Sequence, residues 1–217
     1  MNHAVLRVVG LTVVEFFCGS LMFSYWLGLA AKKDLRSVGD GNPGAFNLWH
    51  AAGFSFGILG GLLDFSKGFF PLMVLISTGY VRGPGIIPVA IAPVLGHAFS
   101  PFLRFRGGKA LAVTMGVWSA ITFQVSVAYA VVLAVLMLLA KLLAKGNPTP
   151  TEIDAFMDVS GMLPIFIYLY FRHFPIYTII VWFSHFVVIS YKNKEKLSRL
   201  LKHKFSEHGR AWRLPSR

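Results

Sequence analysis

Two glycine-rich segments beside basic residues have the composition of an anion-binding site. The first segment, residues 38–47, places Gly39, Gly41 and Gly44 within six residues, and Arg36 lies just before them. Glycines let the backbone approach a ligand closely, and consecutive backbone N–H groups can then form a concave site for an anion. The alternative is a tight turn between two helices, because the segment matches neither nucleotide-binding fingerprint.

The second segment, residues 96–109, ends in Gly107, Gly108 and Lys109, and Arg106 precedes these three residues. Lysine binds a phosphate as a point charge, and arginine can contact it with two parallel hydrogen bonds. His97, at the start of the segment, could be a base, a donor to a phosphate, or a structural histidine. A basic loop that meets lipid headgroups is the alternative, but two such loops on one predicted membrane face favour a phosphate site.

Asp64 and Lys67 are an acid and a base three positions apart within an apolar stretch. That spacing places them on one helix face, where they can pair. Ionisable groups inside a membrane segment are costly, and they usually pair with each other or line a site. The pair therefore indicates either a part of the site or a structural ion pair at a helix break. We find no spacing typical of a metal site and no serine-nucleophile motif.

The composition is that of a membrane protein. Of 217 residues, 55% are hydrophobic and 14% are charged, and the mean hydropathy is +0.63. Soluble domains carry roughly 25% charged residues. A soluble enzyme and a disordered chain are therefore poor fits, and the single Cys18 argues against a disulfide-rich secreted module.

Hydropathy predicts an all-α, polytopic integral membrane helix bundle of five to seven transmembrane helices. A spanning helix needs about 20 apolar residues. We expect Asp64 and Lys67 to divide the second apolar segment, residues 51–80, into two short helices. The fourth segment, residues 110–143, is long enough for one long helix or two short ones. The apolar segments are residues 5–31, 51–80, 86–103, 110–143 and 161–190.

Basic residues are concentrated toward the C-terminus. The net charge is +12, and residues 192–217 contain nine Lys or Arg and two Glu. Short basic loops favour a cytoplasmic side, which predicts an external N-terminus and a cytoplasmic C-terminus. We predict a membrane domain at residues 1–203 and a basic cytoplasmic tail at residues 204–217. The tail would bind anionic lipid headgroups, and nothing beyond charge suggests nucleic-acid binding.

Together, the motifs resemble those of the PlsY-type bacterial acyl-phosphate:glycerol-3-phosphate acyltransferases. The stretch Gly39-Asp-Gly-Asn-Pro-Gly-Ala-Phe-Asn47 is similar to the family's first cytoplasmic motif, commonly Gly-Ser-Gly-Asn-Pro-Gly-Ala-Thr-Asn. Asp64-Phe-Ser-Lys67-Gly resembles its Asp-x-x-Lys-Gly, and residues 95–114 resemble its second motif. Order and spacing also agree, over roughly half of the chain.

The resemblance implies a multi-pass enzyme of phospholipid biosynthesis in the bacterial inner membrane, with seven transmembrane helices. Such enzymes transfer an acyl chain from acyl phosphate to the sn-1 hydroxyl of glycerol 3-phosphate, without a metal, a cofactor or an acyl-enzyme. The products are lysophosphatidic acid and phosphate. By this likeness the catalytic residues would be Asn42, Asn47, His97 and Lys109. The residues that bind substrate or phosphate would be Gly39, Gly41, Gly44, Arg36, Asp64, Lys67, Gly107 and Gly108.

Several positions depart from the family's usual residues. Asp40 stands in place of Ser, Phe46 in place of Thr and His50 in place of Arg, and Asp158 lies where a serine-rich stretch is usual. Asp40 brings negative charge to the phosphate loop, which opposes phosphate binding unless a cation neutralises it. Two alternatives therefore stay open: a relative that uses another acceptor or donor, and a non-catalytic or lipid-handling protein on the same scaffold.

Overall fold

The computed structural model describes residues 3–145 and 149–211, with side chains described as far as residue 202. This part of the chain is helical throughout and contains no strand. The α-helices are α1 His3–Ser20, α2 Phe23–Ala30, α3 Ala45–Ala52, α4 Phe54–Ser77, α5 Ile86–Ala98, α6 Leu111–Ile121, α7 Phe123–Leu143, α8 Thr151–Ser160, α9 Leu163–Phe171 and α10 Ile176–Ala211. Short 3₁₀ turns lie at Leu35–Ser37, Gly83–Gly85 and Pro101–Leu103.

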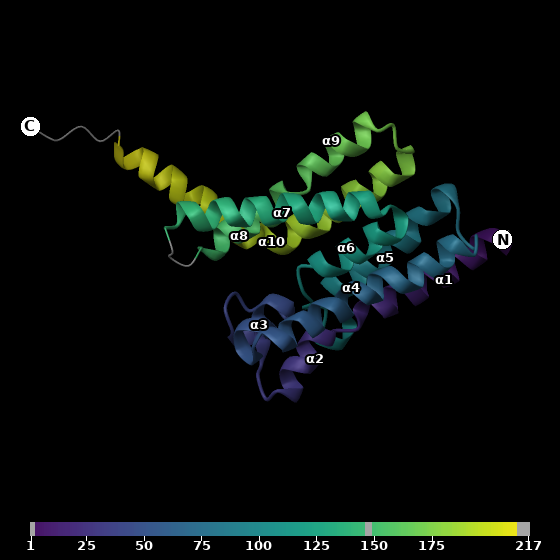
Figure 1. Ribbon diagram of the computed structural model, residues 1–217, viewed down its shortest axis with the longest axis horizontal. Coiled ribbons are helices and arrows are strands. Elements are labelled where there is room, and N and C mark those ends of the chain that lie inside the picture. The colour runs from purple at the N-terminus through teal and green to yellow at the C-terminus, as the bar shows by residue number, and fades with distance from the viewer. Residues whose placement is uncertain (1–2, 146–148, 212–217) are drawn as a thin grey trace, which may run out of the picture.

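Five helical segments in the described residues are long and apolar enough to cross a membrane. They are His3–Ala30, Phe54–Ser77, Gly83–Leu103, Phe123–Leu143 and Thr151–Phe171. The shorter apolar helix α6 and the apolar first half of α10 lie beside them in the bundle (Figure 1). The predicted all-α membrane bundle of five to seven spans is thereby confirmed.

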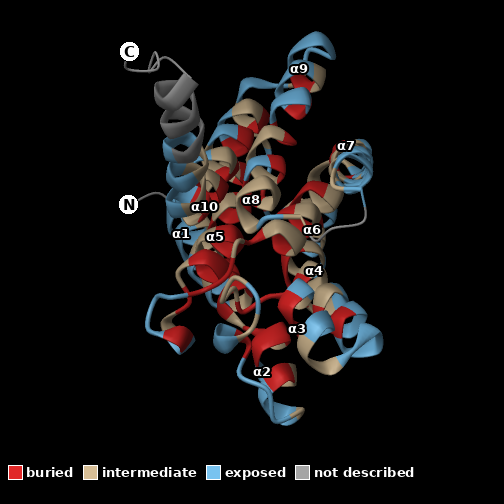
Figure 2. Ribbon diagram, turned by 90° about the vertical axis from the view of Figure 1, so that its left-hand side faces the viewer, coloured by how far each residue is buried: buried red, intermediate tan, exposed pale blue. Residues whose placement is uncertain are grey.

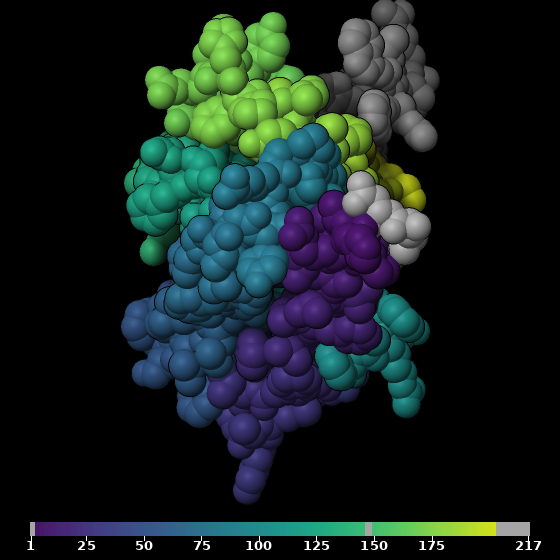
Figure 3. Space-filling model, turned by 90° about the vertical axis from the view of Figure 1, so that its right-hand side faces the viewer, coloured from purple at the N-terminus to yellow at the C-terminus, as the bar shows by residue number. Residues whose placement is uncertain are grey.

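The helices form two adjoining groups (Figure 1). α1, α4, α5 and α6 pack together, with α2 and α3 at one end, and α7 to α10 lie along the other side. On the face drawn in Figure 3, the purple α1 lies beside the blue α4. Buried residues gather along the middle of the bundle, whereas the outer sides of α7 and α9 are exposed, as expected of surfaces that face lipid (Figure 2).

Glycines bring the helices of the first group close together. A Cβ atom added at Gly96 of α5 would lie 2.1 Å from the Phe16 carbonyl oxygen of α1. A Cβ atom added at Gly116 of α6 would lie 2.1 Å from the Phe65 carbonyl oxygen of α4. Small residues are the usual means by which membrane helices approach this closely. The two contacts fix α5 and α6 against their neighbours, and the loop between α5 and α6 therefore has a defined position.

The expected helix break at Asp64 and Lys67 is wrong. α4 runs through both residues, and the chain breaks instead at Gly53, whose φ of +97° is a conformation that favours glycine. α4 stays continuous because both charged groups have partners inside the bundle, as described below.

Thr122 separates α6 from α7, so the fourth apolar segment is two helices. α8 lies between the fourth and fifth predicted apolar segments.

α10 connects the bundle to the polar end of the molecule. It packs on α5 and α8, and its C-terminal end continues beyond the bundle (Figure 1). This packing turns residues 191–199 toward the loops that follow α2 and α5. Of the predicted tail, residues 212–217 lie outside the described residues and the side chains of 204–211 are not described, so the domain boundary stays a prediction.

Candidate active site

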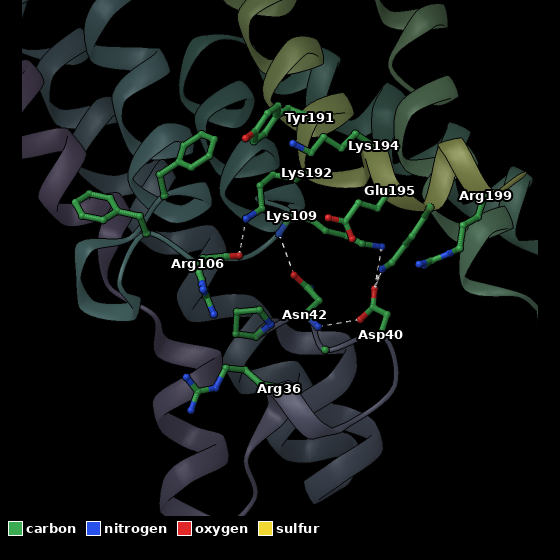
Figure 4. A pocket seen from close by; sticks show the side chains of 16 residues that line it. Arg36, Asp40, Asn42, Arg106, Lys109, Tyr191, Lys192, Lys194, Glu195 and Arg199 are labelled. Atoms are coloured by element: carbon green, nitrogen blue, oxygen red, sulfur yellow. Dashed lines mark hydrogen bonds and ion pairs between the residues drawn. The ribbon is translucent and has the colours of Figure 1, made fainter. Parts of the chain in front are cut away.

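A pocket of about 690 Å³ lies where the two glycine-rich loops meet α10 (Figure 4). The loops contribute residues 36–43 and 105–109, and α10 contributes residues from Tyr191 to Arg199. Cations outnumber carboxylates on its walls, which suits an anionic ligand. The cations are Arg36, Arg106, Lys109, Lys192, Lys194, Lys196 and Arg199, and the carboxylates are Asp40 and Glu195.

The side chain of Asn47 holds the first loop in shape. Its Nδ2 donates to the carbonyl oxygens of Val38 and Asn42, at 2.8 Å and 2.9 Å, and to Oδ1 of Asp40 at 2.9 Å. A Cβ atom at Gly39, where φ is +54°, would lie 2.6 Å from Oδ1 of Asn47. Asn47 is buried and does not line the pocket, so it supports the loop from behind.

The two loops are joined to each other at Asn42 and Lys109. The backbone N–H of Lys109 donates to Oδ1 of Asn42 at 3.0 Å (Figure 4). The N–H of Gly108 donates to the carbonyl oxygen of His97 at 3.1 Å. Gly107 packs so closely that an added Cβ atom would lie 1.9 Å from the same carbonyl oxygen. Both glycines are therefore needed for the second loop to lie flat against the end of α5.

Lys109 lies among several charges. Its Nζ is 2.9 Å from Oδ2 of Asp158 and 3.4 Å from Oδ2 of Asp40, and Asp40 also pairs with Lys196 of α10. Burial raises the pKa of Asp40, but the Lys196 hydrogen bond and the Lys109 charge outweigh burial and lower it to about 2. Burial lowers the pKa of Lys109, and the two carboxylates more than offset this, so its pKa is raised.

Two lysines thus neutralise the unusual Asp40. From the sequence, Asp40 was expected to oppose phosphate binding unless a cation neutralised it, and the structure supplies two such cations. Of the other departures, Phe46 and His50 stack edge to face with ring centroids 4.6 Å apart, and neither lines the pocket. Phe46 is half exposed and leaves the pocket wall unchanged. Asp158 reaches the site only through Lys109.

Asp64, Lys67 and His97 form a buried cluster behind the second loop. Nζ of Lys67 donates to the Leu21 carbonyl oxygen, to Oδ1 of Asp64 at 2.8 Å and to Nδ1 of His97 at 2.8 Å. Oδ2 of Asp64 accepts a hydrogen bond from Ser24 of α2. These partners satisfy both charges within the bundle, which explains why α4 is not interrupted.

The cluster also fixes the tautomer of His97. An ammonium group only donates hydrogen bonds, so Nδ1 of His97 accepts from Lys67 and the ring proton lies on Nε2. Nε2 faces Gly108, where an added Cβ atom would lie 2.4 Å from it. His97 is therefore set up as a donor next to the second loop rather than as a base.

The structure brings the predicted site residues into two layers. Residues on the pocket wall are Arg36, Gly41, Asn42, Gly107 and Lys109. Residues in contact with these loops or with the cluster behind them are Gly39, Gly44, Asn47, Asp64, Lys67, His97 and Gly108. Arg36 is mostly exposed at the rim and forms a surface ion pair with Asp34 at 3.1 Å.

The α10 cations are the pocket residues that the sequence prediction missed. From the sequence, Lys194, Lys196 and Arg199 were only part of the basic C-terminal segment, residues 192–217. In the structure, Lys196 pairs with Asp40, and Arg199 pairs with Glu152 at 3.0 Å. Lys192 donates to the carbonyl oxygens of Ala98 and Gly107, at 3.0 Å and 2.8 Å (Figure 4). The high density of charge in residues 192–199 could have indicated that these residues contribute to the site. It did not indicate which residue each cation would contact.

The arrangement of the site is suited to holding phosphate groups near the membrane surface. Backbone donors and several ammonium groups line one pocket, with His97 buried behind its second loop, and such groups stabilise negative charge that develops during a reaction. Among the described residues, no group of three or more His, Cys, Asp or Glu could hold a metal ion.

Comparison with known proteins identifies the family of this chain. A family described as glycerol-3-phosphate acyltransferase matches residues 9–203. Glycerol-3-phosphate acyltransferase 1 of Thermotoga maritima is 37% identical over 198 residues, which cover 88% of this chain and 97% of the relative. The glycerol-3-phosphate acyltransferase of Aquifex aeolicus is 27% identical, over 90% of this chain and 96% of the relative.

A solved structure is also similar. The crystal structure of PlsY (YgiH), an integral membrane glycerol 3-phosphate acyltransferase in its glycerol 3-phosphate form, superposes with a TM-score of 0.76. It is 26% identical in sequence, and the match covers 90% of this chain and 92% of that chain. The chain therefore belongs to the glycerol-3-phosphate acyltransferase family and is a multi-pass membrane acyltransferase.

Proposed function

We propose that this acyltransferase moves an acyl chain from acyl phosphate to the sn-1 hydroxyl of glycerol 3-phosphate, in phospholipid biosynthesis. The observation that carries the proposal is the cationic pocket in which Asn42 joins the two phosphate-binding motifs through Lys109. The names of the relatives support glycerol 3-phosphate as the acceptor. Both substrates carry a phosphate group, which the excess of cations over carboxylates suits.

The reaction requires no base from the protein. The sn-1 oxygen attacks the acyl carbon, a new ester C–O bond forms, and the C–O bond to phosphate breaks. The phosphate leaves with the electron pair of that bond, and one of its oxygens takes the proton of the attacking hydroxyl. Atoms and charges balance, and the products are lysophosphatidic acid and phosphate. This route agrees with the position of the His97 ring proton, which leaves Nε2 unable to accept.

The role of the protein is to stabilise the charge on the leaving phosphate. In our proposal the ammonium group of Lys109 binds phosphate oxygens, Asn42 orients Lys109, and His97 shapes the second loop from behind. Arg36 and the backbone of Gly41 and its neighbours add donors from the opposite wall. Such preorganised donors are worth about 2.7–4 kcal/mol each in comparable sites.

The remaining predicted residues act from behind the pocket. Asn47 holds the first loop through three acceptors, and Gly39 and Gly44 let that loop pack closely. Asp64 and Lys67 hold the His97 ring and its tautomer. Gly107 and Gly108 let the second loop lie against α5.

An acceptor that is itself cationic is less well supported. Asp40 would be the group to bind it, but two lysines already neutralise its carboxylate, one of them also held by Asp158. A phosphate-bearing acceptor suits this pocket better, because the cations on its walls outnumber the two carboxylates, Asp40 and Glu195.

We also propose that the chain lies in a bacterial inner membrane, with its N-terminus outside and its C-terminus in the cytoplasm. Basic loops near residues 32–36 and 104–109 support this orientation through the excess of positive charge on the cytoplasmic side. The basic tail, residues 204–217, would then face anionic lipid headgroups. Labelling of single cysteines placed near each terminus, in intact cells and in lysed cells, tests the orientation.

Product analysis tests the proposed reaction. Purified protein is incubated with palmitoyl phosphate and glycerol 3-phosphate, and lipids are identified by mass spectrometry with assignment of the acyl position. We expect 1-acyl lysophosphatidic acid, and we expect Lys109→Ala to lower its formation by about 10²–10³-fold while the protein stays folded. Acylation of a different acceptor by the wild type, or wild-type turnover by Lys109→Ala, would overturn the proposal.

A further inference from the structure

An ion pair between Asp40 and Lys196 joins the first phosphate loop to α10 across the pocket. The two residues are 156 positions apart in the sequence, and both side chains are largely buried. We propose that this pair sets the anion affinity of the pocket: Lys196 neutralises Asp40, so that Asp158 is the one uncompensated carboxylate paired with Lys109 when a substrate phosphate binds. Lys196 is then a positioning residue, and the identity of the phosphate ligand rests on the proposed function.

The loop itself fixes the orientation of the Asp40 carboxylate. Oδ1 accepts hydrogen bonds from the backbone N–H of Asn42 at 3.1 Å and from Nδ2 of Asn47 at 2.9 Å. Oδ2 is the oxygen that contacts both Lys196 and Lys109. Because Oδ1 is held at two points, the carboxylate cannot turn away when one of its lysine partners is lost.

Lys196 supplies one of the two positive charges in the ion pairs at this place. Asp40 and Asp158 contribute two negative charges to these pairs, and Lys109 and Lys196 contribute two positive charges. The carboxylate of Asp154 lies close enough to act on Asp40 and both lysines, and it adds further negative charge. Without Lys196, Lys109 alone would face two carboxylates in a partly buried site, and a phosphate would have to bind against a net negative charge. Like charges at such distances repel strongly when they are removed from water.

Other cations of the pocket are placed for different contacts. Arg199 pairs with Glu152, and Lys192 is held by two backbone carbonyl oxygens. Lys194 lies 4.0 Å above the ring of Tyr191. Among the described residues, Asp40 makes its ion pairs with Lys109 and Lys196 only, so no neighbouring cation of α10 already supplies the missing charge.

The test compares Lys196→Gln, Asp40→Asn and the double variant in the full-length protein. Asparagine keeps an oxygen for the N–H of Asn42 and for Asn47, so the loop retains its hydrogen bonds. Two quantities are measured for each variant: the Kd for inorganic phosphate by calorimetry, and KM and kcat for glycerol 3-phosphate. Lys202→Gln is the matched control, because it removes the same charge from an exposed position on the same helix.

We expect Lys196→Gln to raise both Kd and KM at least about tenfold, with kcat changed by less than about threefold. Adding Asp40→Asn to Lys196→Gln should restore both constants to within about threefold of the wild type, because the unpaired carboxylate is then gone. Asp40→Asn alone should bind phosphate no more weakly than the wild type. Lys196→Arg keeps the charge and should stay within about threefold of the wild type, as should Lys202→Gln.

Several results would overturn the proposal. They are an unchanged Kd and KM in Lys196→Gln, a loss in Lys196→Gln that Asp40→Asn fails to recover, or a wild-type protein that does not bind phosphate. If Lys196→Gln does not fold, the Kd values of the double variant and of Lys196→Arg for phosphate test the proposal instead. Weak phosphate binding by either of these variants contradicts the proposal. If the wild type binds phosphate but transfers no acyl group, the proposed function fails while the Kd series still tests the ion pair.

Discussion

The contact between Gly108 and His97 allows a sharp test of how the two loops form the site. In Gly108→Ala, the new Cβ atom would lie 2.4 Å from Nε2 of His97 and 3.3 Å from Oδ1 of Asn42. The ring cannot easily move, because His97 is buried and Lys67 holds its other nitrogen. The loop must therefore shift away from α5, and Lys109 shifts with it.

The size of the effect follows from the cost of overpacking. Inserting a methyl group into a well-packed site costs about 1–3 kcal/mol. Since about 1.36 kcal/mol corresponds to a tenfold change, kcat/KM should fall by about five- to 150-fold. The loss should appear in activity more than in stability, because the second loop lies at the end of α5 and can move without unpacking the helices.

The assay measures phosphate release from palmitoyl phosphate in the presence of glycerol 3-phosphate, together with thermal unfolding in the same detergent. Gly61→Ala is the matched control, because its Cβ atom would meet only the Cβ atom of Ala45, at an ordinary 3.5 Å. We expect this control to retain wild-type activity. Wild-type turnover by Gly108→Ala, or an equal loss in both variants, would refute the reasoning.

Three further predictions concern the groups behind and beside the pocket. Asp64→Ala leaves Lys67 buried without its carboxylate, so folding should be destabilised by about 3–5 kcal/mol, and an unchanged thermal unfolding temperature would contradict this. Asn47→Ala removes the amide that holds three acceptors, so KM for glycerol 3-phosphate should rise by about tenfold, and a wild-type KM would argue against a role of Asn47 in shaping the loop. The pKa of Asp40 is lowered to about 2 from 3.8, so its contribution to stability is fully present above about pH 4 and is lost as the pH falls through about 2. Asp40→Asn should therefore not change the shape of the pH–rate profile between about pH 5 and pH 8, and a new inflection in that range would contradict the assignment.

The sequence was sufficient to predict the fold class and the approach of the two loops. Long apolar segments leave few alternatives to a helical membrane bundle, and basic glycine-rich loops on one predicted face were expected to share a ligand. The Asp64–Lys67 spacing predicted their ion pair, which the structure confirms at 2.8 Å. These features depend on local composition or on short spacings.

Features that depend on distant partners could not be predicted. The expected break in α4 followed from the cost of placing two charged residues inside an apolar segment, but Ser24 and His97, from α2 and α5, supply further partners for them. Likewise, the charge of Lys196 indicated a polar surface, and nothing local pointed to Asp40 as its partner. A single sequence gives the polarity of each helix face but does not reveal which polar groups meet.

The measurement that tests the central claim most directly is phosphate release from palmitoyl phosphate by the purified protein, with and without glycerol 3-phosphate. We predict that release depends on glycerol 3-phosphate and that each phosphate released is matched by one molecule of lysophosphatidic acid. Release that is equally fast without glycerol 3-phosphate, or no release by folded protein with both substrates present, would contradict the account.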